Sequence, residues 1–316
     1  MISNSNYLPS NQRKLYGFQE ILANLVNLYK KNNLPNKILF SGPKGIGKAT
    51  LSYHLVNFIL SNDEKYKYDL NKSEINDLNK SYNLIKNKSH PNFLLVDVID
   101  GKNKIEISQI RELISYSNKS SFNNKERIIF IDNIENLNFN SLNALLKIIE
   151  EPNDNVIFIL VLNNYKNISA TLKSRCIKFN LSLSFDERIK ITNKLINNDI
   201  TNILNKDLIH YYNTPGDYLN LINFSKNSKI NLLDYDLKKF LFFLIESNDF
   251  KKNSYVQNNI FKFIELYFLK LMKISTSKKE INILNSFFVK KISDLKKFNL
   301  DPESLFIEFK TRILGE

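Results

Sequence analysis

Apolar residues recur along the first 180 positions in two alternating patterns. Short runs that are apolar on both faces, as expected of strands buried within a sheet, occur at residues 37–40, 93–98, 128–131, 156–162 and 177–179. Between them, apolar residues recur at helical spacing over residues 17–29, 51–59, 107–115 and 142–151. This alternation predicts an α/β fold with a parallel sheet that is covered by helices on both sides.

The strand pattern stops near residue 184, and only helical periodicity follows. A polar segment at 225–229 indicates a second boundary. We therefore predict an α/β domain over 1–182, a small helical domain over 183–227 and an all-α domain over 228–316. Helical stretches of the tail carry more apolar surface than one amphipathic stripe needs. Either a self-contained helical bundle or a subunit interface would explain that surplus.

The segment SGPKGIGKAT, residues 41–50, follows the first strand and precedes a helix, which is the context of a phosphate-binding loop. The residues that could bind a nucleotide are Gly42, Pro43, Lys44, Gly45, Ile46, Gly47, Lys48, Ala49 and Thr50. Lys48 would bring positive charge to the outer phosphates, and the following helix would offer its positive end. In the complete motif, a hydroxyl after the lysine holds Mg²⁺. Ala49 stands there instead, and Thr50 lies about 100° further around the helix. The metal site is therefore expected to be impaired.

The strand at 128–131 ends in Asp132, at the position of the Mg²⁺-binding acid of such enzymes. A capping role without metal is the alternative. Many hydrolases place a glutamate next, to activate the attacking water, but Asn133 follows here and its amide cannot accept a proton. Glu135 comes two positions later and is expected to point elsewhere. Ala49 and Asn133 together predict that the chain does not hydrolyse nucleotide by itself.

The segment TLKSRC, residues 171–176, contains a candidate catalytic residue, Arg175. An arginine beside the γ-phosphate of a neighbouring subunit stabilises the transition state and is worth about 10³ to 10⁵ in rate. An ordinary surface arginine is the alternative. The position of Arg175 after the loop and a full strand–helix series favours the catalytic role.

Four segments occur in the order found in bacterial clamp-loader subunits: the loop at 41–50, IIFID at 128–132, NALLKIIEEP at 143–152 and SRC at 174–176. The chain resembles this AAA+ family over roughly residues 8–182, and the last two segments are far more specific than the loop. Within the family it is similar to the delta-prime type of DNA polymerase III subunit. The gamma/tau motor type keeps the threonine and the glutamate that are replaced here.

The resemblance implies an AAA+ P-loop NTPase-type domain, a helical lid and a helical collar that holds five subunits in a ring. It implies a stationary subunit of a DNA-directed DNA polymerase holoenzyme that helps to load the sliding clamp onto primed DNA during replication. Such a subunit offers its SRC arginine, here Arg175, to ATP on an adjacent motor subunit. Asn163 matches the position that senses the γ-phosphate, and Asp217 stands where many relatives place a second sensing arginine.

The same resemblance implies a hetero-oligomer. Its expected partners are the gamma/tau motor subunits, the delta subunit, primed DNA within the assembly and, indirectly, the sliding clamp. Two alternatives stay open. One is an ATP-hydrolysing motor subunit or related AAA+ ATPase, and the other is a basic nucleotide-binding protein outside any ring. A net charge of +13 favours a polyanionic partner, or it reflects an AT-rich coding bias.

ATP or ADP is the cofactor that the loop could hold. Cys176 is the only cysteine, which excludes an intrachain disulfide and the four-cysteine zinc module that several relatives carry. With three scattered histidines, no metal site and no zinc are expected. The single cysteine, the absence of a signal pattern at the N-terminus and the lack of a long apolar run predict a cytoplasmic protein without membrane contact.

Overall fold

The computed structural model describes residues 7–99, 101–118, 125–153, 155–163 and 168–315. By its internal contacts the chain divides into two compact units, which we call the sheet unit and the helical unit. The sheet unit consists of Met1–Leu195 and Asn213–Leu219, and the helical unit consists of Ile196–Tyr212 and Asn220–Glu316. The division into three domains at 182 and 227 stays a prediction.

The sheet unit contains the parallel five-stranded sheet that the apolar runs predict. Its strand order is β2 (Phe93–Val96), β3 (Arg127–Ile131), β4 (Val156–Asn163), β1 (Lys37–Gly42) and β5 (Ile177–Asn180). Every pair of neighbours is parallel, and the register sets Gly42 opposite Asn163. The carboxyl ends of all five strands therefore meet at one edge, where α/β sheets bind their ligands.

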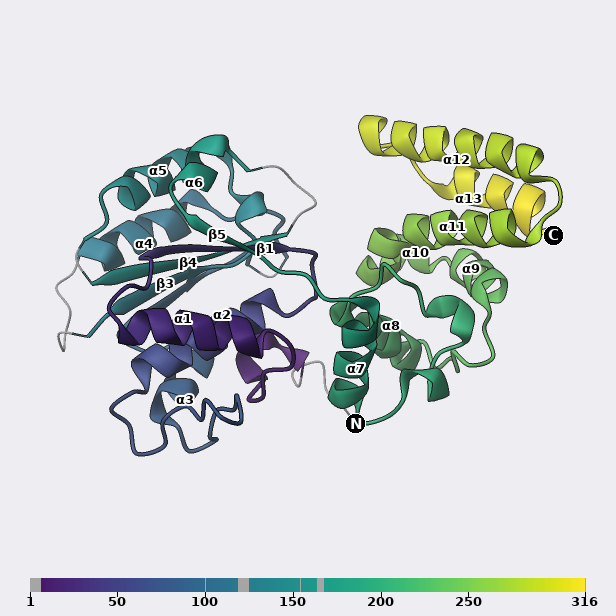
Figure 1. Ribbon diagram of the computed structural model, residues 1–316. Helices are drawn as coiled ribbons and strands as arrows, with labels where there is room; N and C mark the ends of the chain where they lie inside the picture. The colour runs from purple at the N-terminus through teal and green to yellow at the C-terminus, as the bar shows by residue number, and fades with distance from the viewer. Residues whose placement is uncertain (1–6, 100, 119–124, 154, 164–167, 316) are drawn as a thin grey trace. The chain divides into compact units, whose positions relative to one another are not determined.

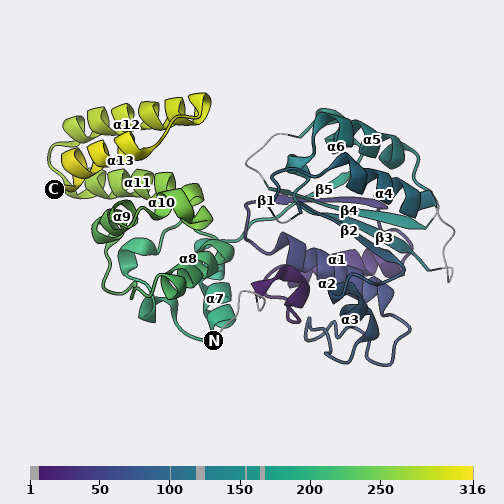
Figure 2. The same cartoon turned by 180° about the vertical axis from the view of Figure 1, so that it is seen from behind.

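Helices cover both faces of this sheet (Figures 1 and 2). One face carries α1 (Gln19–Lys30) and α2 (Lys48–Leu60), with α3 (Lys80–Lys86) packed against α2, and the other carries α4 (Ile107–Asn118), α5 (Phe139–Glu150) and α6 (Ala170–Ser174). A hydrophobic core lies on each side. Because side chains alternate along a strand, Phe40 joins the core under α1 and α2, whereas Leu39 joins the core under α4 and α5.

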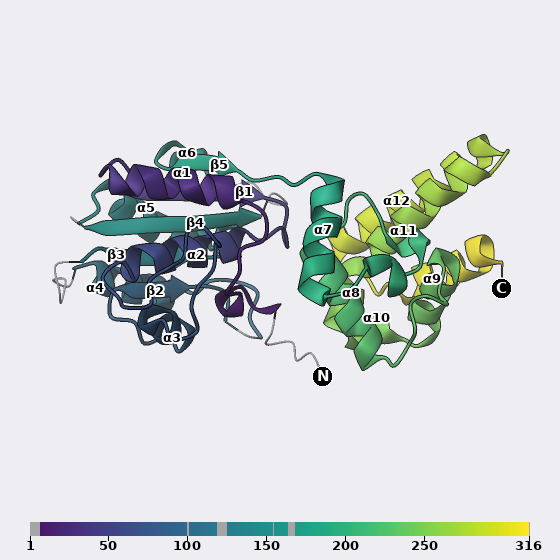
Figure 3. The same ribbon diagram turned by 60° about the horizontal axis from the view of Figure 1, so that its bottom comes forward.

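The helical unit builds a core of its own from the tail (Figures 1 and 3). Its elements are α9 (Leu237–Glu246), α10 (Asp249–Lys252), α11 (Ser254–Ile274), α12 (Lys278–Phe298) and α13 (Glu303–Phe309). The rings of Phe268, Phe288 and Phe309 pack with centroids 5.3–5.9 Å apart. Much of the apolar surplus of the tail is thus used within the bundle. Ile274, Ile283 and Phe298 are nevertheless 60–67% exposed, so the subunit interface stays a prediction beside the self-contained bundle.

Two helices, α7 (Phe185–Ile196) and α8 (Pro215–Asn227), contribute residues to both units. α8 begins in the sheet unit, and its first turn touches the loop that follows β1, as described below.

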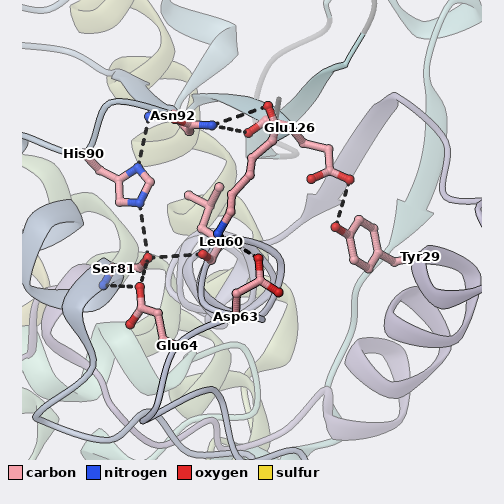
Figure 4. Close-up of polar contacts among 9 residues, drawn as sticks. Tyr29, Leu60, Asp63, Glu64, Ser81, His90, Asn92 and Glu126 are labelled. Carbon is pink, nitrogen blue, oxygen red and sulfur yellow. Dashed lines mark hydrogen bonds and ion pairs between the residues drawn. The ribbon is translucent and has the colours of Figure 1, made fainter. Parts of the chain in front are cut away.

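The polar segment between α2 and β2 is held by a hydrogen-bonded cluster (Figure 4). The Glu64 carboxylate caps α3 by accepting from the N–H groups of Lys80 (2.8 Å) and Ser81 (2.9 Å), and it also accepts from Ser81 Oγ at 2.5 Å. His90 Nδ1 accepts from the Asn92 N–H, so Nε2 carries the proton and donates to Ser81 Oγ at 3.2 Å. A ring that donates to the hydroxyl cannot be its base, so Ser81 is not an activated nucleophile.

His54 on α2 is also engaged on both ring nitrogens. Nε2 donates to the Gln12 carbonyl oxygen at 3.0 Å, and Nδ1 accepts from the Tyr68 hydroxyl at 2.8 Å. Burial lowers the pKa of His54 to about 4, and burial likewise lowers the pKa of His90 to about 4. Both rings are therefore neutral in the folded chain at pH 7.

These two pKa values predict how stability depends on pH. Between pH 6.5 and 4 the unfolded chain binds more protons at His54 than the folded chain, so acidification must destabilise the fold. At about 1.4 kcal/mol per pKa unit, each ring should cost roughly 2 kcal/mol on going from pH 7 to pH 5. In urea unfolding at the two pH values, His54→Gln should remove about that share of the loss.

The control is His210→Gln, because the His210 ring is only partly buried. This control should leave most of the pH dependence in place. A His54→Gln variant that keeps the full acid loss would contradict the assignment.

Candidate functional site

Three glycines shape the turn from β1 into α2. A Cβ on Gly42 would lie 2.4 Å from the Leu181 carbonyl oxygen, so β1 can end only on a residue without a side chain. Gly45 and Gly47 have φ of +83° and +100°, a backbone region that residues with a Cβ rarely adopt. α2 then begins at Lys48. The chain therefore forms the strand–loop–helix that the motif predicts.

The ammonium of Lys48 is bound by acceptors of the protein itself. Nζ donates to the carbonyl oxygens of Gly42 (3.0 Å) and Pro43 (2.6 Å) and to Asn163 Oδ1 (2.8 Å). An ammonium has three N–H donors, so all of them are used. Lys48 is only 3% exposed. Burial lowers its pKa to about 8, against the opposing effect of the Asp132 and Glu135 charges.

Asn163, at the end of β4, links this lysine to the loop after β3. Its Nδ2 donates to Asn133 Oδ1 (2.9 Å) and to Glu135 Oε1 (2.7 Å), and its backbone N–H donates to Glu135 Oε2 (3.2 Å). The expectation that Glu135 points elsewhere is therefore wrong. The reason is local: Asn133 adopts a left-handed conformation, and the 3₁₀ turn Ile134–Asn136 then returns Glu135 to the edge of the sheet.

The acid at the end of β3 lies beside a second acid that follows β2. Asn133 Nδ2 donates to Asp97 Oδ1 at 2.7 Å, and Asp132 Oδ1 accepts from the Asn133 N–H at 2.8 Å. Burial, and then the charge of Asp97, raise the pKa of Asp132 to about 7. A metal-binding role for Asp132 stays a prediction. Asp97 was missed as a site residue, although it carries the same signal as Asp132, an acid directly after a buried strand.

The other loop residues face the core or solvent. Ile46 is 2% exposed, and the Ala49 methyl packs against the core under α1 and α2. Lys44 is exposed, and Thr50 lies partly buried in the first turn of α2. Where the motif expects a metal-binding hydroxyl, the chain therefore has a packing contact.

The start of α8 packs directly on the loop. The Gly216 N–H donates to the Gly45 carbonyl at 2.9 Å, and a Cβ on Gly45 would lie 2.5 Å from Thr214 Oγ1. Thr214 and Asp217 cap the helix reciprocally: Asp217 Oδ2 accepts from the Thr214 N–H (3.0 Å), and the Asp217 N–H donates to Thr214 Oγ1 (3.2 Å). Asp217, at the position where a sensing arginine is expected, is thus a helix cap.

Arg175 is held apart from the loop residues, directly after α6. Its Nη2 lies 2.6 Å from Glu150 Oε1, and its Nη1 donates to the Thr171 carbonyl oxygen at 2.8 Å. The side chain is 34% exposed. Within the described part of the chain, no hydrogen bond or ion pair connects Arg175 to the loop. Burial raises the pKa of the neighbouring Cys176 to about 11, which makes that thiol unreactive.

This arrangement has consequences for chemistry at the loop. Hydrolysis needs a base that takes a proton from water. The Asn133 amide cannot do so, and both carboxylate oxygens of Glu135 accept from Asn163. Among the residues that the structure describes, no group of three or more His, Cys, Asp or Glu side chains is arranged to hold a metal ion.

A protein-family model described as DNA polymerase III, delta subunit, matches residues 17–184, more than half of the chain. The chain belongs to this family. Relatives of the chain include both the gamma or gamma/tau type and the delta-prime type of clamp-loader subunit. It is 27% identical over 310 residues to DNA polymerase III subunit gamma of Buchnera aphidicola from Acyrthosiphon pisum, covering 95% of the chain and 82% of that protein.

Over 287 residues it is 25% identical to subunit delta' of Buchnera aphidicola from Schizaphis graminum, covering 86% of the chain and 83% of that protein. Over 246 residues it is 28% identical to subunit gamma/tau of Mycoplasma genitalium, covering 73% of the chain but only 38% of the relative. The sequence similarity therefore places the chain in the DNA polymerase III clamp-loader family without choosing between the two types.

In the described parts of this family member, no helix is both long and apolar enough to cross a bilayer.

The contacts of Lys48 predict that this lysine stabilises the sheet unit even without a nucleotide. Lys48→Met keeps the length of the side chain but leaves the Gly42, Pro43 and Asn163 oxygens without their donor. Buried acceptors without partners should lower the free energy of unfolding by about 1–3 kcal/mol in urea titrations. Lys44→Met, at an exposed lysine of the same loop, is the matched control and should change it by less than about 0.5 kcal/mol. Equal stabilities of the two variants would refute a structural role for Lys48.

Proposed function

We propose that the chain is a delta-prime-type subunit of the clamp loader, a stationary subunit that does not hydrolyse ATP itself and helps to load the sliding clamp onto primed DNA. The observation that carries this proposal is the network at the loop. All three donors of Lys48 are used by the protein, and the position of the water-activating acid is held by Asn133.

ATP or ADP could bind at the loop only after Lys48 leaves the Gly42 and Pro43 carbonyls. That exchange replaces contacts which already satisfy the ammonium, so the gain on binding phosphate is small. The hydroxyl that would hold Mg²⁺ is missing at Ala49 as well. We therefore propose weak nucleotide binding and no turnover.

In this proposal the catalytic residue of the chain is Arg175, and it acts on ATP held by a neighbouring motor subunit of the gamma/tau type. Three observations support it. Arg175 is the arginine of the SRC pattern, and its side chain is partly exposed. Within the described residues it takes no part in the network around Lys48. The proposed assembly also contains a delta subunit and contacts primed DNA and the clamp only as a whole.

One observation favours the alternative, an ATP-hydrolysing motor subunit. Glu135 lies at the loop, and its charge acts on Lys48. If binding of a nucleotide freed Glu135 from Asn163, its carboxylate could accept a proton from water. The two functions differ in the activity of the isolated chain.

The first prediction of the delta-prime proposal concerns the chain alone. Purified chain with Mg-ATP should release no phosphate above the background of a Lys48→Met variant. Glu135→Gln should leave that background unchanged. ATP turnover that is lost in Glu135→Gln would instead identify a motor subunit with Glu135 as its base.

The second prediction concerns Arg175 in the assembly. Chain, motor subunits and delta subunit should together load clamps onto primed DNA, and Arg175→Ala should slow loading at least about tenfold, since transition-state charge next door loses its partner. Lys178→Ala removes an exposed cation three residues away and should have no effect. Gel filtration should show that both variants assemble. Normal loading by an assembled Arg175→Ala ring would exclude an action of Arg175 in trans.

A further inference from the structure

The segment NALLKIIEEP contains a contact that the proposed function does not explain. Its Glu150, the last residue of α5, lies 2.6 Å from Arg175 Nη2. We infer that Glu150 is the positioning residue of Arg175: it orients the guanidinium in the free subunit and keeps hold of it while the arginine acts on a neighbour's phosphate. This inference rests on the proposed role of Arg175 in trans.

Two contacts from different directions define the orientation of the guanidinium. Glu150 binds Nη2 from α5, and the Thr171 carbonyl oxygen accepts from Nη1 at 2.8 Å from α6. Arginine has a long side chain that loses considerable rotamer entropy when it is ordered. Because both contacts are present in the free subunit, most of that entropy is lost before a partner arrives. It therefore does not reduce the free energy with which the arginine stabilises the transition state.

The contacts with Glu150 and Thr171 leave N–H donors of Arg175 for a phosphate. A guanidinium has five N–H groups. Glu150 takes one on Nη2 and Thr171 takes one on Nη1, so the Nε donor and one donor on each terminal nitrogen are not used by any residue that the structure describes. The side chain as a whole is 34% exposed, so it is not sealed off from a partner. Glu150 therefore does not compete with an incoming phosphate for the whole arginine, as a bidentate carboxylate would.

The location of Glu150 is unfavourable for the helix alone. The carboxyl end of a helix has partial negative charge, and an acid there is destabilising. α5 nevertheless ends on Glu150, with Glu151 as its C-cap and Pro152 next. The ion pair with Arg175 offsets this unfavourable charge at Glu150. Glu151 is exposed, and within the described residues it makes no hydrogen bond or ion pair, so it offers a matched control.

The test is the DNA-stimulated ATPase of the reconstituted assembly, measured with four forms of the chain: Glu150→Gln, Glu151→Gln, Arg175→Ala and the double variant Glu150→Gln/Arg175→Ala. Glu150→Gln should lower kcat about five- to tenfold and leave KM for ATP unchanged, because the arginine acts in the transition state. Glu151→Gln should match the unaltered chain. The double variant should be no slower than Arg175→Ala, because Glu150 acts only through the arginine.

A fifth form, Glu150→Asp, keeps the charge and should retain more activity than Glu150→Gln. If Arg175→Ala lowers the rate while Glu150→Gln behaves like Glu151→Gln, the inference fails and the proposed function stands. If Arg175→Ala itself has no effect, the proposed function fails. A rate increase in Glu150→Gln, or a loss that persists in the Arg175→Ala background, would show that Glu150 restrains the arginine or acts through the fold, and would overturn the positioning role.

Discussion

A buried ammonium must be satisfied where it lies, and this constraint organises the carboxyl edge of the sheet. Lys48 is almost inaccessible to water, so an unpaired charge there would cost several kcal/mol. The chain meets that demand with the Gly42 and Pro43 carbonyls and with Asn163. Asn163 Nδ2 in turn donates to Asn133 Oδ1, and Asn133 Nδ2 donates to Asp97 Oδ1. One cation thus connects the ends of four neighbouring strands.

The same acceptors show that the protein itself can satisfy the lysine of this loop. In a working loop the lysine and the helix start await an anion. Here the lysine is turned onto its own loop, the Ala49 methyl belongs to the core, and Gly45 is packed against Gly216. The acceptors of Lys48 satisfy a group that a phosphate would otherwise satisfy, and the contacts of Ala49 and Gly45 are packing within the fold. Retention of the loop as part of the fold therefore requires no retained ATP hydrolysis.

The sheet could be predicted from sequence because both of its faces are buried, which leaves continuous apolar runs of strand length between helical segments. Topology then fixed Asp132 and Asn163 at one edge. The direction of Glu135 could not be predicted, since it depends on a left-handed φ at Asn133 and on the short 3₁₀ turn after it. The pairing of Glu150 with Arg175 could not be predicted either, because 24 residues that include β4 and α6 separate the two, and neither pattern nor spacing encodes such a contact.

An arginine that serves a neighbour faces opposing demands. Its side chain must be ordered before the partner arrives, because otherwise conformational entropy is lost during catalysis. At the same time, the groups that order it must leave some of its N–H donors free. Lys48 is a contrasting case, because its ammonium has three donors, all three are bound to acceptors of the protein, and none is left for another ligand. Among the described residues, acceptors bind two of the five donors of Arg175, which leaves three. The planar, many-donor guanidinium permits this division of its donors, whereas an ammonium with three bound acceptors does not.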